Sequence, residues 1–294
     1  MGLPEPDRAG FVDVNRTRLR VWEWGDRAAP AVVCLHGAYD HGRMFDGLAP
    51  HLAGRGFRVL APDLRGHGDS GRVGSGNTWM ASALDVALLA RHAGAPLGLV
   101  GHSMGGGQAT FVAGVWPELV RWVVNLDGLG PPADRFEERD LAESASQGLQ
   151  AVQRAMARPP RVYPSVEDMV ERRRRINVRL PDEWIEHLVR HASRPTEGGY
   201  AWKFDPLFSV GLPGDFSHEH LLAEHELVSC PVLVLTGSEH DTWSDLGDEE
   251  IAGRLAGMPG ARHHVIAGAG HYVHVEQPEA VFAEIDTFLT EVGA

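Results

Sequence analysis

The segment 101–105, with the pattern G-x-S-x-G, constrains the fold more than any other part of this chain. An apolar run at 97–100 before it predicts a buried strand, and a helical pattern at 108–116 follows it. A turn this short between a strand and a helix forces Ser103 into a strained backbone conformation, and side chains at the two flanking glycines would collide with neighbouring backbone. The turn therefore predicts a serine hydroxyl at the N-terminus of a helix, where free N–H groups can stabilise negative charge.

Apolar, β-branched runs alternate with helical patterns along the rest of the chain. The runs that predict buried strands are 31–35, 57–61, 97–100, 122–126, 231–236 and 262–266, and the helical patterns between and after them are 43–54, 78–93, 108–116, 247–256 and 278–291. Two further segments, 11–15 and 17–24, predict a hairpin of edge strands. Strands that alternate with helices form parallel sheets covered on both faces. The sequence therefore predicts an α/β fold with a mostly parallel, eight-stranded sheet flanked by helices.

Residues 131–225 interrupt this alternation. Three charged helical patterns predominate there, at 135–157, 165–177 and 182–192. We interpret the segment as a helical cap inserted after the sixth strand, with the core domain formed by 1–130 and 226–294. The dense basic run at 171–175 is interpreted as a solvated helix face rather than as an anion site.

Composition excludes several classes of protein. The net charge of −13 disfavours nucleic acid or an anionic membrane as a partner. No apolar run approaches the length of about 18 residues that spans a bilayer, and the polar segment 1–10 has no signal core, so we expect a cytoplasmic protein. Cys34 and Cys230 are expected to be small buried or strand-edge residues rather than a disulfide. His187 and His191 have i, i+4 spacing but no evident acidic third ligand, so no metal site is expected.

Four segments, in this order along the core, resemble motifs of the α/β-hydrolases: 36–37 after a strand, 63–70 with the pattern D-x-R-G-x-G-x-S, the nucleophile elbow at 101–105, and 270–271 followed by 276–279. The resemblance implies an α/β-hydrolase fold with Ser103 as the nucleophile. It also implies that His102 points away from the substrate side.

A serine hydroxyl is a poor nucleophile at neutral pH and needs a base to take its proton. Histidine suits that role because its unperturbed pKa of about 6.5 lies close to neutral pH. Of the candidate histidines, His271 follows a strand and a glycine-rich run that can carry it over the sheet to Ser103. The sequence therefore predicts His271 as the base.

The acid that would orient this histidine has two candidates. In the α/β-hydrolases it most often follows the seventh strand, but His240 stands at that position here and Asp241 comes one residue later. Some members of the family take the acid from the end of the sixth strand, where Asp127 lies. We favour Asp127 and keep Asp241 as the alternative.

An oxyanion hole needs two donors directed at the developing charge. The N–H of Met104, after the nucleophile, is the first candidate, and the resemblance implies the N–H of Ala38 as the second. Tyr39 and His41 are expected to line the pocket from the same loop. Trp202 and Trp243 are the candidate pocket walls, and aromatic walls suit an apolar or ring-bearing acyl substrate.

These residues predict a serine hydrolase that cleaves a small carboxylic ester, lactone or related acyl substrate through an acyl-enzyme, with no cofactor. Serine at the elbow excludes the alkyl-enzyme chemistry of relatives that carry aspartate there. Two alternatives stay open: the same triad used for C–C bond hydrolysis, amide hydrolysis or perhydrolysis, and a non-catalytic ligand receptor on the same scaffold.

Overall fold

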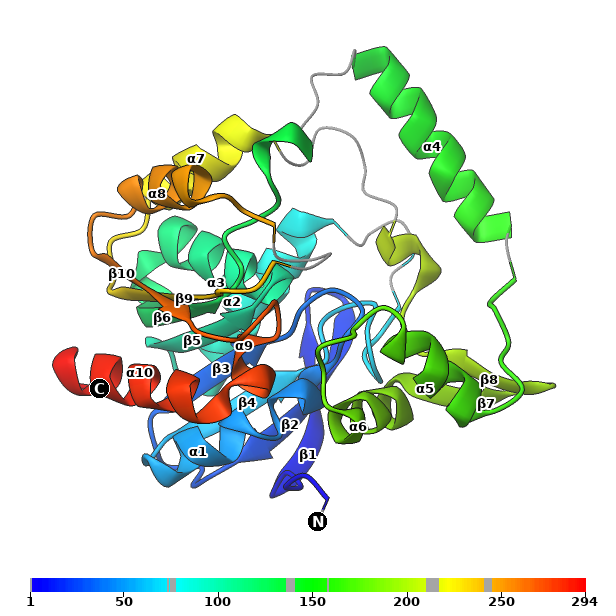
Figure 1. The fold of residues 1–294 in the computed structure, drawn as a ribbon, viewed down its shortest axis with the longest axis horizontal. Coiled ribbons are helices and arrows are strands. Elements are labelled where there is room, and N and C mark those ends of the chain that lie inside the picture. Colours follow the sequence, from blue (N-terminus) through cyan, green and yellow to red (C-terminus); the bar gives the residue numbers. More distant parts are fainter. Residues whose placement is uncertain are drawn as a thin grey trace.

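The computed structural model describes residues 2–72, 74, 78–135, 141–157, 159–209, 217–240 and 245–294. Its centre is an eight-stranded sheet with the order β1-β2-β4-β3-β5-β6-β9-β10 (Figure 1). The strands are β1 (Arg8–Val14), β2 (Thr17–Trp24), β3 (Ala31–Leu35), β4 (Arg58–Pro62), β5 (Leu97–His102), β6 (Val120–Leu126), β9 (Val232–Gly237) and β10 (Ala261–Ile266). β2 pairs antiparallel with β1 and β4, and the other pairs are parallel. The predicted mostly parallel, eight-stranded sheet is confirmed.

Helices connect the strands and follow the insertion. The described α-helices are α1 (Leu48–Gly54), α2 (Trp79–Ala93), α3 (Met104–Val115), α4 (Leu141–Ala157), α5 (Val166–Arg174), α6 (Asp182–Ala192), α7 (His218–Glu226), α8 (Asp248–Ala256), α9 (Val273–Glu276) and α10 (Pro278–Glu291). The described 3-10 turns include η1 (Gly42–Phe45), η3 (Pro117–Leu119), η4 (Ala133–Arg135) and η5 (Pro206–Ser209).

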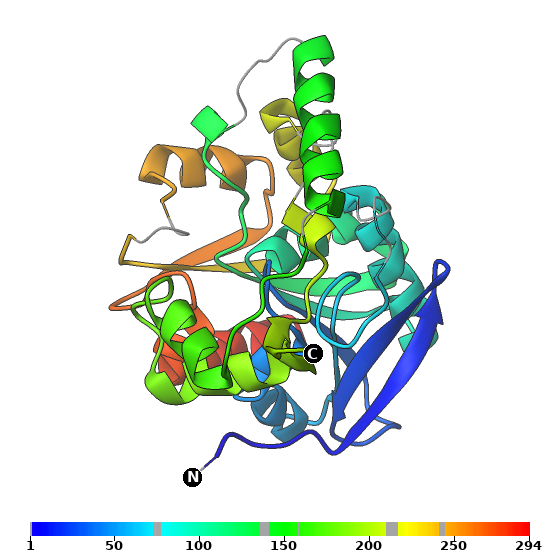
Figure 2. The same cartoon turned by 90° about the vertical axis from the view of Figure 1, so that its right-hand side faces the viewer.

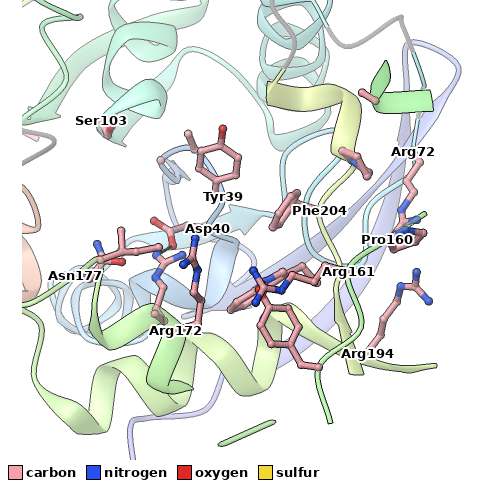
Figure 3. A pocket seen from close by; sticks show the side chains of 18 of the residues that line it. Tyr39, Asp40, Arg72, Ser103, Pro160, Arg161, Arg172, Asn177, Arg194 and Phe204 are labelled. Carbon is pink, nitrogen blue, oxygen red and sulfur yellow. Dashed lines mark hydrogen bonds and ion pairs between the residues drawn. The ribbon is translucent and has the colours of Figure 1, made fainter. Parts of the chain in front are cut away.

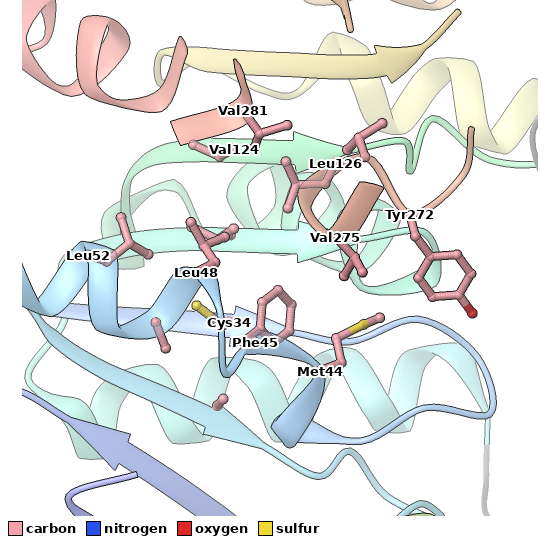
Figure 4. Packing of buried hydrophobic residues seen from close by; sticks show 14 of the residues in the cluster. Cys34, Met44, Phe45, Leu48, Leu52, Val124, Leu126, Tyr272, Val275 and Val281 are labelled. Carbon is pink, nitrogen blue, oxygen red and sulfur yellow. The ribbon is translucent and has the colours of Figure 1, made fainter. Parts of the chain in front are cut away.

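The central strands bury side chains on both faces, which is why they are continuous β-branched runs rather than alternating ones. In β3, Cys34 belongs to the cluster that packs against α1 and α10, whereas Leu35 belongs to the cluster against α2 and α3. Figure 4 shows the first cluster, with Leu48 of α1 and Val281 of α10 among its members. The two helical layers hold the sheet rigid, so the loops at its carboxyl edge have a fixed base.

The insertion lies between β6 and β9 and contains more than the helices that the sequence predicts. After α4, α5 and α6 it forms a two-stranded hairpin of β7 (Ser193–Thr196) and β8 (Gly199–Trp202). Gly198 and Gly199 have φ of 82° and 146°, which favours glycine at this turn. Figure 2 shows α4 projecting from the body of the molecule. α7, by contrast, packs beside α3 of the core, and the domain limits at 131 and 225 stay a prediction.

Candidate active site

Ser103 lies on the turn between β5 and α3, with φ of 54° and ψ of −122°. The strained conformation that the sequence predicts is therefore present. A Cβ at Gly101 would lie 2.1 Å from the carbonyl oxygen of Gly105, and a Cβ at Gly105 would lie 2.1 Å from that of Leu35. Glycine is required at both positions because backbone, which cannot move aside, fills the space.

His271 reaches this turn from the loop after β10 and pairs with an aspartate from a different strand. Its Nδ1 lies 2.7 Å from Oδ2 of Asp127, and the two side chains are 7% and 9% exposed. A carboxylate oxygen accepts, so the proton of a neutral His271 sits on Nδ1 and leaves Nε2 as the basic atom. Asp241, the alternative acid, lies outside the described residues.

The end of β6 presents Asp127 through a turn that the sequence analysis did not identify. Asp127 has φ of 52°, and its N–H donates to the carbonyl oxygen of Leu235 in β9 (2.8 Å). The side chain of Asn125 accepts from the N–H of Gly128 (2.8 Å) and donates to its carbonyl oxygen (3.2 Å). Asn125 is fully buried and closes the turn around Asp127. An asparagine two residues before the aspartate is the only sequence signal for this role.

Glu276 holds the loop that carries His271. Its carboxylate accepts from the N–H of Gly270 (2.9 Å) and from the N–H of Tyr272 (3.2 Å), on either side of the histidine. Arg179 of the insertion donates to the same carboxylate (2.7 Å). Glu276 therefore positions the loop of His271. It belongs to the segment 276–279, for which the sequence predicted only a resemblance to a family motif and no role.

His36 shapes the loop after β3, from which Ala38 is expected to donate. The N–H of Leu64 donates to Nε2 of His36 (2.9 Å), so the imidazole carries its proton on Nδ1 and donates to the carbonyl oxygen of Gly37 (2.7 Å). Burial holds the pKa of His36 well below its usual range, so the ring stays neutral. In a trans peptide the N–H points opposite to the C=O, so the N–H of Ala38 is directed away from His36.

The same loop passes close to the nucleophile. A Cβ at Gly37 would lie 3.0 Å from Nδ1 of His102 and 3.2 Å from Cβ of Ser103. Met104 is the first residue of α3, and the first N–H groups of a helix have no partner within the helix. The loop that carries Ala38 and the first turn of α3, which carries Met104, thus both lie next to Ser103.

A cavity of about 720 Å³ surrounds these groups, and Ala38, Ser103 and His271 all line it. Figure 3 shows Tyr39 and Phe204 on its wall. Their rings make an edge contact with centroids 5.4 Å apart. Trp202, a candidate pocket wall, also lines the cavity, as does Tyr39, whereas Phe204 was not among the candidates.

One expectation about pocket residues is wrong. His41 is 2% exposed and bonds through Nε2 to the carbonyl oxygen of Leu188 in α6 (2.9 Å), so it packs beneath the insertion rather than lining the cavity. His102 is buried, as expected: it packs against the rings of His271 and Tyr272 and donates from Nε2 to the carbonyl oxygen of His271 (2.9 Å), although it also borders the cavity. Trp243 lies outside the described residues.

The insertion also contacts the loop after β3, which carries Ala38, through a buried ion pair. Arg173 of α5 donates to Oδ1 of Asp40 (2.5 Å) and to the hydroxyl of Tyr272 (3.0 Å), and that hydroxyl donates to Oδ2 of Asp40 (3.2 Å). Burial raises the pKa of Asp40, and the charge of Arg173 opposes the rise. One side chain of the insertion thus joins the loop of Ala38 to the loop of His271.

His187, one of the two histidines on α6, has an acidic neighbour. The structure brings Asp46 to within 2.8 Å of Nε2 of His187, a neighbour that the sequence did not reveal. The guanidinium of Arg43 already binds that carboxylate at 2.7 Å. Among the described residues, no group of three or more potential metal ligands is found. In the same part of the chain, no helix is both long and apolar enough to cross a bilayer.

A serine on a strained strand–helix turn, beside a histidine–aspartate pair at the carboxyl edge of a parallel sheet, is the arrangement of serine hydrolases. A family model for the alpha/beta hydrolase fold matches residues 30–278. The chain belongs to this family.

Individual relatives match along most of their length. A serine hydrolase-like protein of Dictyostelium discoideum is 27% identical, over 91% of this chain and 77% of the relative. A 2-(acetamidomethylene)succinate hydrolase of Mesorhizobium japonicum is 27% identical, over 95% of this chain and 94% of the relative. Among solved structures, a hypothetical protein of Pseudomonas aeruginosa PAO1 superposes with a TM-score of 0.85 at 27% identity, over 96% of this chain and 99% of that one.

Proposed function

We propose that this protein hydrolyses a small carboxylic ester, lactone or related acyl substrate through an acyl-enzyme on Ser103. The observation that carries the proposal is the pair of His271 and Asp127, 2.7 Å apart, beside the cavity that Ser103 lines. The names of relatives, which include serine hydrolases, esterases and lipases, support the reaction class.

In this mechanism Nε2 of His271 takes the proton of Ser103 as the oxygen attacks the acyl carbon. The N–H groups of Ala38 and Met104 donate to the oxyanion that forms, and Asp127 stabilises the imidazolium. His271 then gives its proton to the leaving group. A water molecule, deprotonated by the same histidine, releases the acid and restores the serine. The chain's own residues supply every one of these proton transfers.

Covalent labelling with a fluorophosphonate tests the nucleophile. Intact-mass measurement and peptide mapping are expected to show one adduct, on Ser103, which Ser103→Ala abolishes. Ser193→Ala is the matched control, because Ser193 lies outside the cavity and bonds only the carbonyl oxygen of Arg190. Folded wild-type protein that stays unlabelled would refute the proposal.

A substrate panel separates the remaining alternatives. p-Nitrophenyl esters, a lactone, an anilide and a β-diketone are compared by kcat/KM on the wild type and on Ser103→Ala. Serine-dependent turnover of the ester or lactone above the other classes supports the proposed reaction, and preference for the anilide or diketone moves it to amide or C–C bond hydrolysis. Ligand binding without serine-dependent turnover of any substrate would favour the receptor.

A further inference from the structure

The wall of the cavity is strongly cationic, although the chain as a whole has 27 basic and 40 acidic residues. Among the described residues that line the cavity, one acid, Asp40, is opposed by six arginines: Arg72, Arg154, Arg161, Arg172, Arg173 and Arg194. They come from a core loop, from α4 and α5, from β7 and from the segment before α5, so the cluster is assembled by the fold.

Within the described part of the chain, most of these guanidinium groups have no carboxylate partner. Arg173 is neutralised by Asp40. Of the others, Arg72 donates to the carbonyl oxygen of Lys203, and Arg161 lies 4.8 Å over the ring of Tyr163. Nε of Arg194 is buried and has no hydrogen-bond partner within the described part of the chain. Arg194 is partly buried, and an uncompensated guanidinium that is shielded from water is costly unless an anion joins it. Arg72, Arg154, Arg161 and Arg172 are exposed to solvent, so their charges are available to an incoming ligand.

The basic run at 171–175 divides between two environments. Arg174 and Arg175 both bind Glu171 on the solvent side of α5, as expected for a solvated face. Arg172 and Arg173 line the cavity instead. The interpretation of the whole run as a solvated face is therefore wrong for Arg173, which is largely buried against Asp40, whereas Arg172 is exposed to solvent as well as bordering the cavity.

Two of the arginines, Arg72 and Arg194, lie in a different part of the cavity from the nucleophile. Figure 3 shows Ser103 at one side and Arg72 and Arg194 at the other, with Tyr39 and Phe204 between them in that view. An acyl chain that lies along the aromatic residues would place its reactive carbonyl at Ser103 and its far end among the guanidinium groups. Guanidinium binds carboxylate and phosphate through paired, charge-assisted hydrogen bonds.

We infer that the substrate of the proposed acyl hydrolase carries a negatively charged group, a carboxylate or a phosphate, at the end remote from the scissile bond. This inference rests on the proposed function and adds the substrate class to it. The arginine wall binds the charged end, and the aromatic wall binds the segment between that end and the carbonyl.

Matched substrates test the inference. The p-nitrophenyl monoester of suberic acid, which ends in a carboxylate, is compared with its neutral ω-methyl ester. In a second pair, octanoyl-phosphopantetheine is compared with octanoyl-pantetheine, which lacks only the phosphate. We expect kcat/KM to favour the charged member of at least one pair by about tenfold or more, with a preference that weakens as salt is added. The responsive pair identifies the anion as carboxylate or phosphate.

Arginine variants locate the preference. Arg161→Gln and Arg172→Gln are expected to lower the charged-to-neutral ratio by about tenfold each, because each removes one charge-assisted contact. Arg175→Gln is the control, since Arg175 belongs to the same basic run but is 71% exposed and bound to Glu171. A ratio near one in both substrate pairs for the wild type, or equal loss in the control, would overturn the inference.

Calorimetry separates failure of this inference from failure of the proposed function. Suberate and phosphopantetheine, which need no turnover, are titrated into the wild type and into Arg161→Gln and Arg172→Gln. Binding that weakens in these variants supports the anion site even where Ser103 is not labelled and the hydrolase proposal fails. Labelling of Ser103 without binding of either anion, and without a charged-substrate preference, rejects the anion site alone.

Discussion

Arg173→Met tests how the insertion controls the two catalytic loops. The guanidinium and the carboxylate of Asp40 are 12% and 2% exposed, so the variant leaves a buried charge behind. Removing one partner of a buried ion pair costs about 3–5 kcal/mol of unfolding free energy. Tyr272 still donates to Asp40 (3.2 Å), so we expect a loss of about 3 kcal/mol. At roughly 2–4 °C per kcal/mol, the melting temperature should fall by roughly 6–12 °C at neutral pH.

The loss should depend on pH in a defined direction. Burial raises the pKa of Asp40, and the variant removes the cation that opposes this rise. The folded variant therefore binds the carboxyl proton more tightly than the unfolded chain does. The variant keeps its stability below the pKa of the Asp40 carboxyl in the unfolded chain, about 3.9. It loses stability as the pH rises through the pKa of the same carboxyl in the folded protein. The deficit relative to the wild type should be smaller at about pH 4 than at about pH 8.

Thermal melts across this pH range measure the effect. Arg175→Met is the control, because a surface pair contributes at most about 1 kcal/mol. Adding Asp40→Asn to Arg173→Met removes the buried charge and should restore part of the stability at neutral pH. A variant Arg173→Met that melts with the control, or a deficit that does not change with pH, would contradict this account of the pair.

Three further changes test other parts of the structure. Asp127→Asn should lower kcat by about 10⁴-fold, because the imidazole of His271 loses its orienting acid. A loss of this size in Asp241→Asn instead would show that Asp241 is the acid. Gly105→Ala places a Cβ 2.1 Å from the carbonyl oxygen of Leu35 and should yield little folded protein, whereas Gly54→Ala, with nothing within 4 Å, should fold normally. Burial raises the pKa of Glu224 to about 7, so stability from this residue is present at acid pH and lost as pH approaches 7. Glu224→Gln should therefore raise the melting temperature at about pH 8 but not at about pH 4.

The parts of the fold that could be predicted from sequence depend on short segments. A buried parallel strand is a continuous apolar run wherever it lies in the sheet, so β3 and β5 were visible without their neighbours. The turn at Ser103 was visible because its glycines are required by backbone contacts within a few residues and with β3. The hairpin of β7 (Ser193–Thr196) and β8 (Gly199–Trp202) is not predicted by the sequence because its strands are four residues each, too short to establish an alternating pattern.

The amino-acid sequence by itself therefore determined the sheet, the strained turn and the residue types available for catalysis. Tertiary structure decided which of them meet: His271 and Asp127 are 144 positions apart and approach only because β6 and β10 flank β9 at one edge. It also decided that His41 is buried by α6, and that Arg173 is largely buried against Asp40 while Arg175 faces solvent. These outcomes depend on how one element packs against another, and the order of side chains along the chain does not determine that packing in any way that can be read locally.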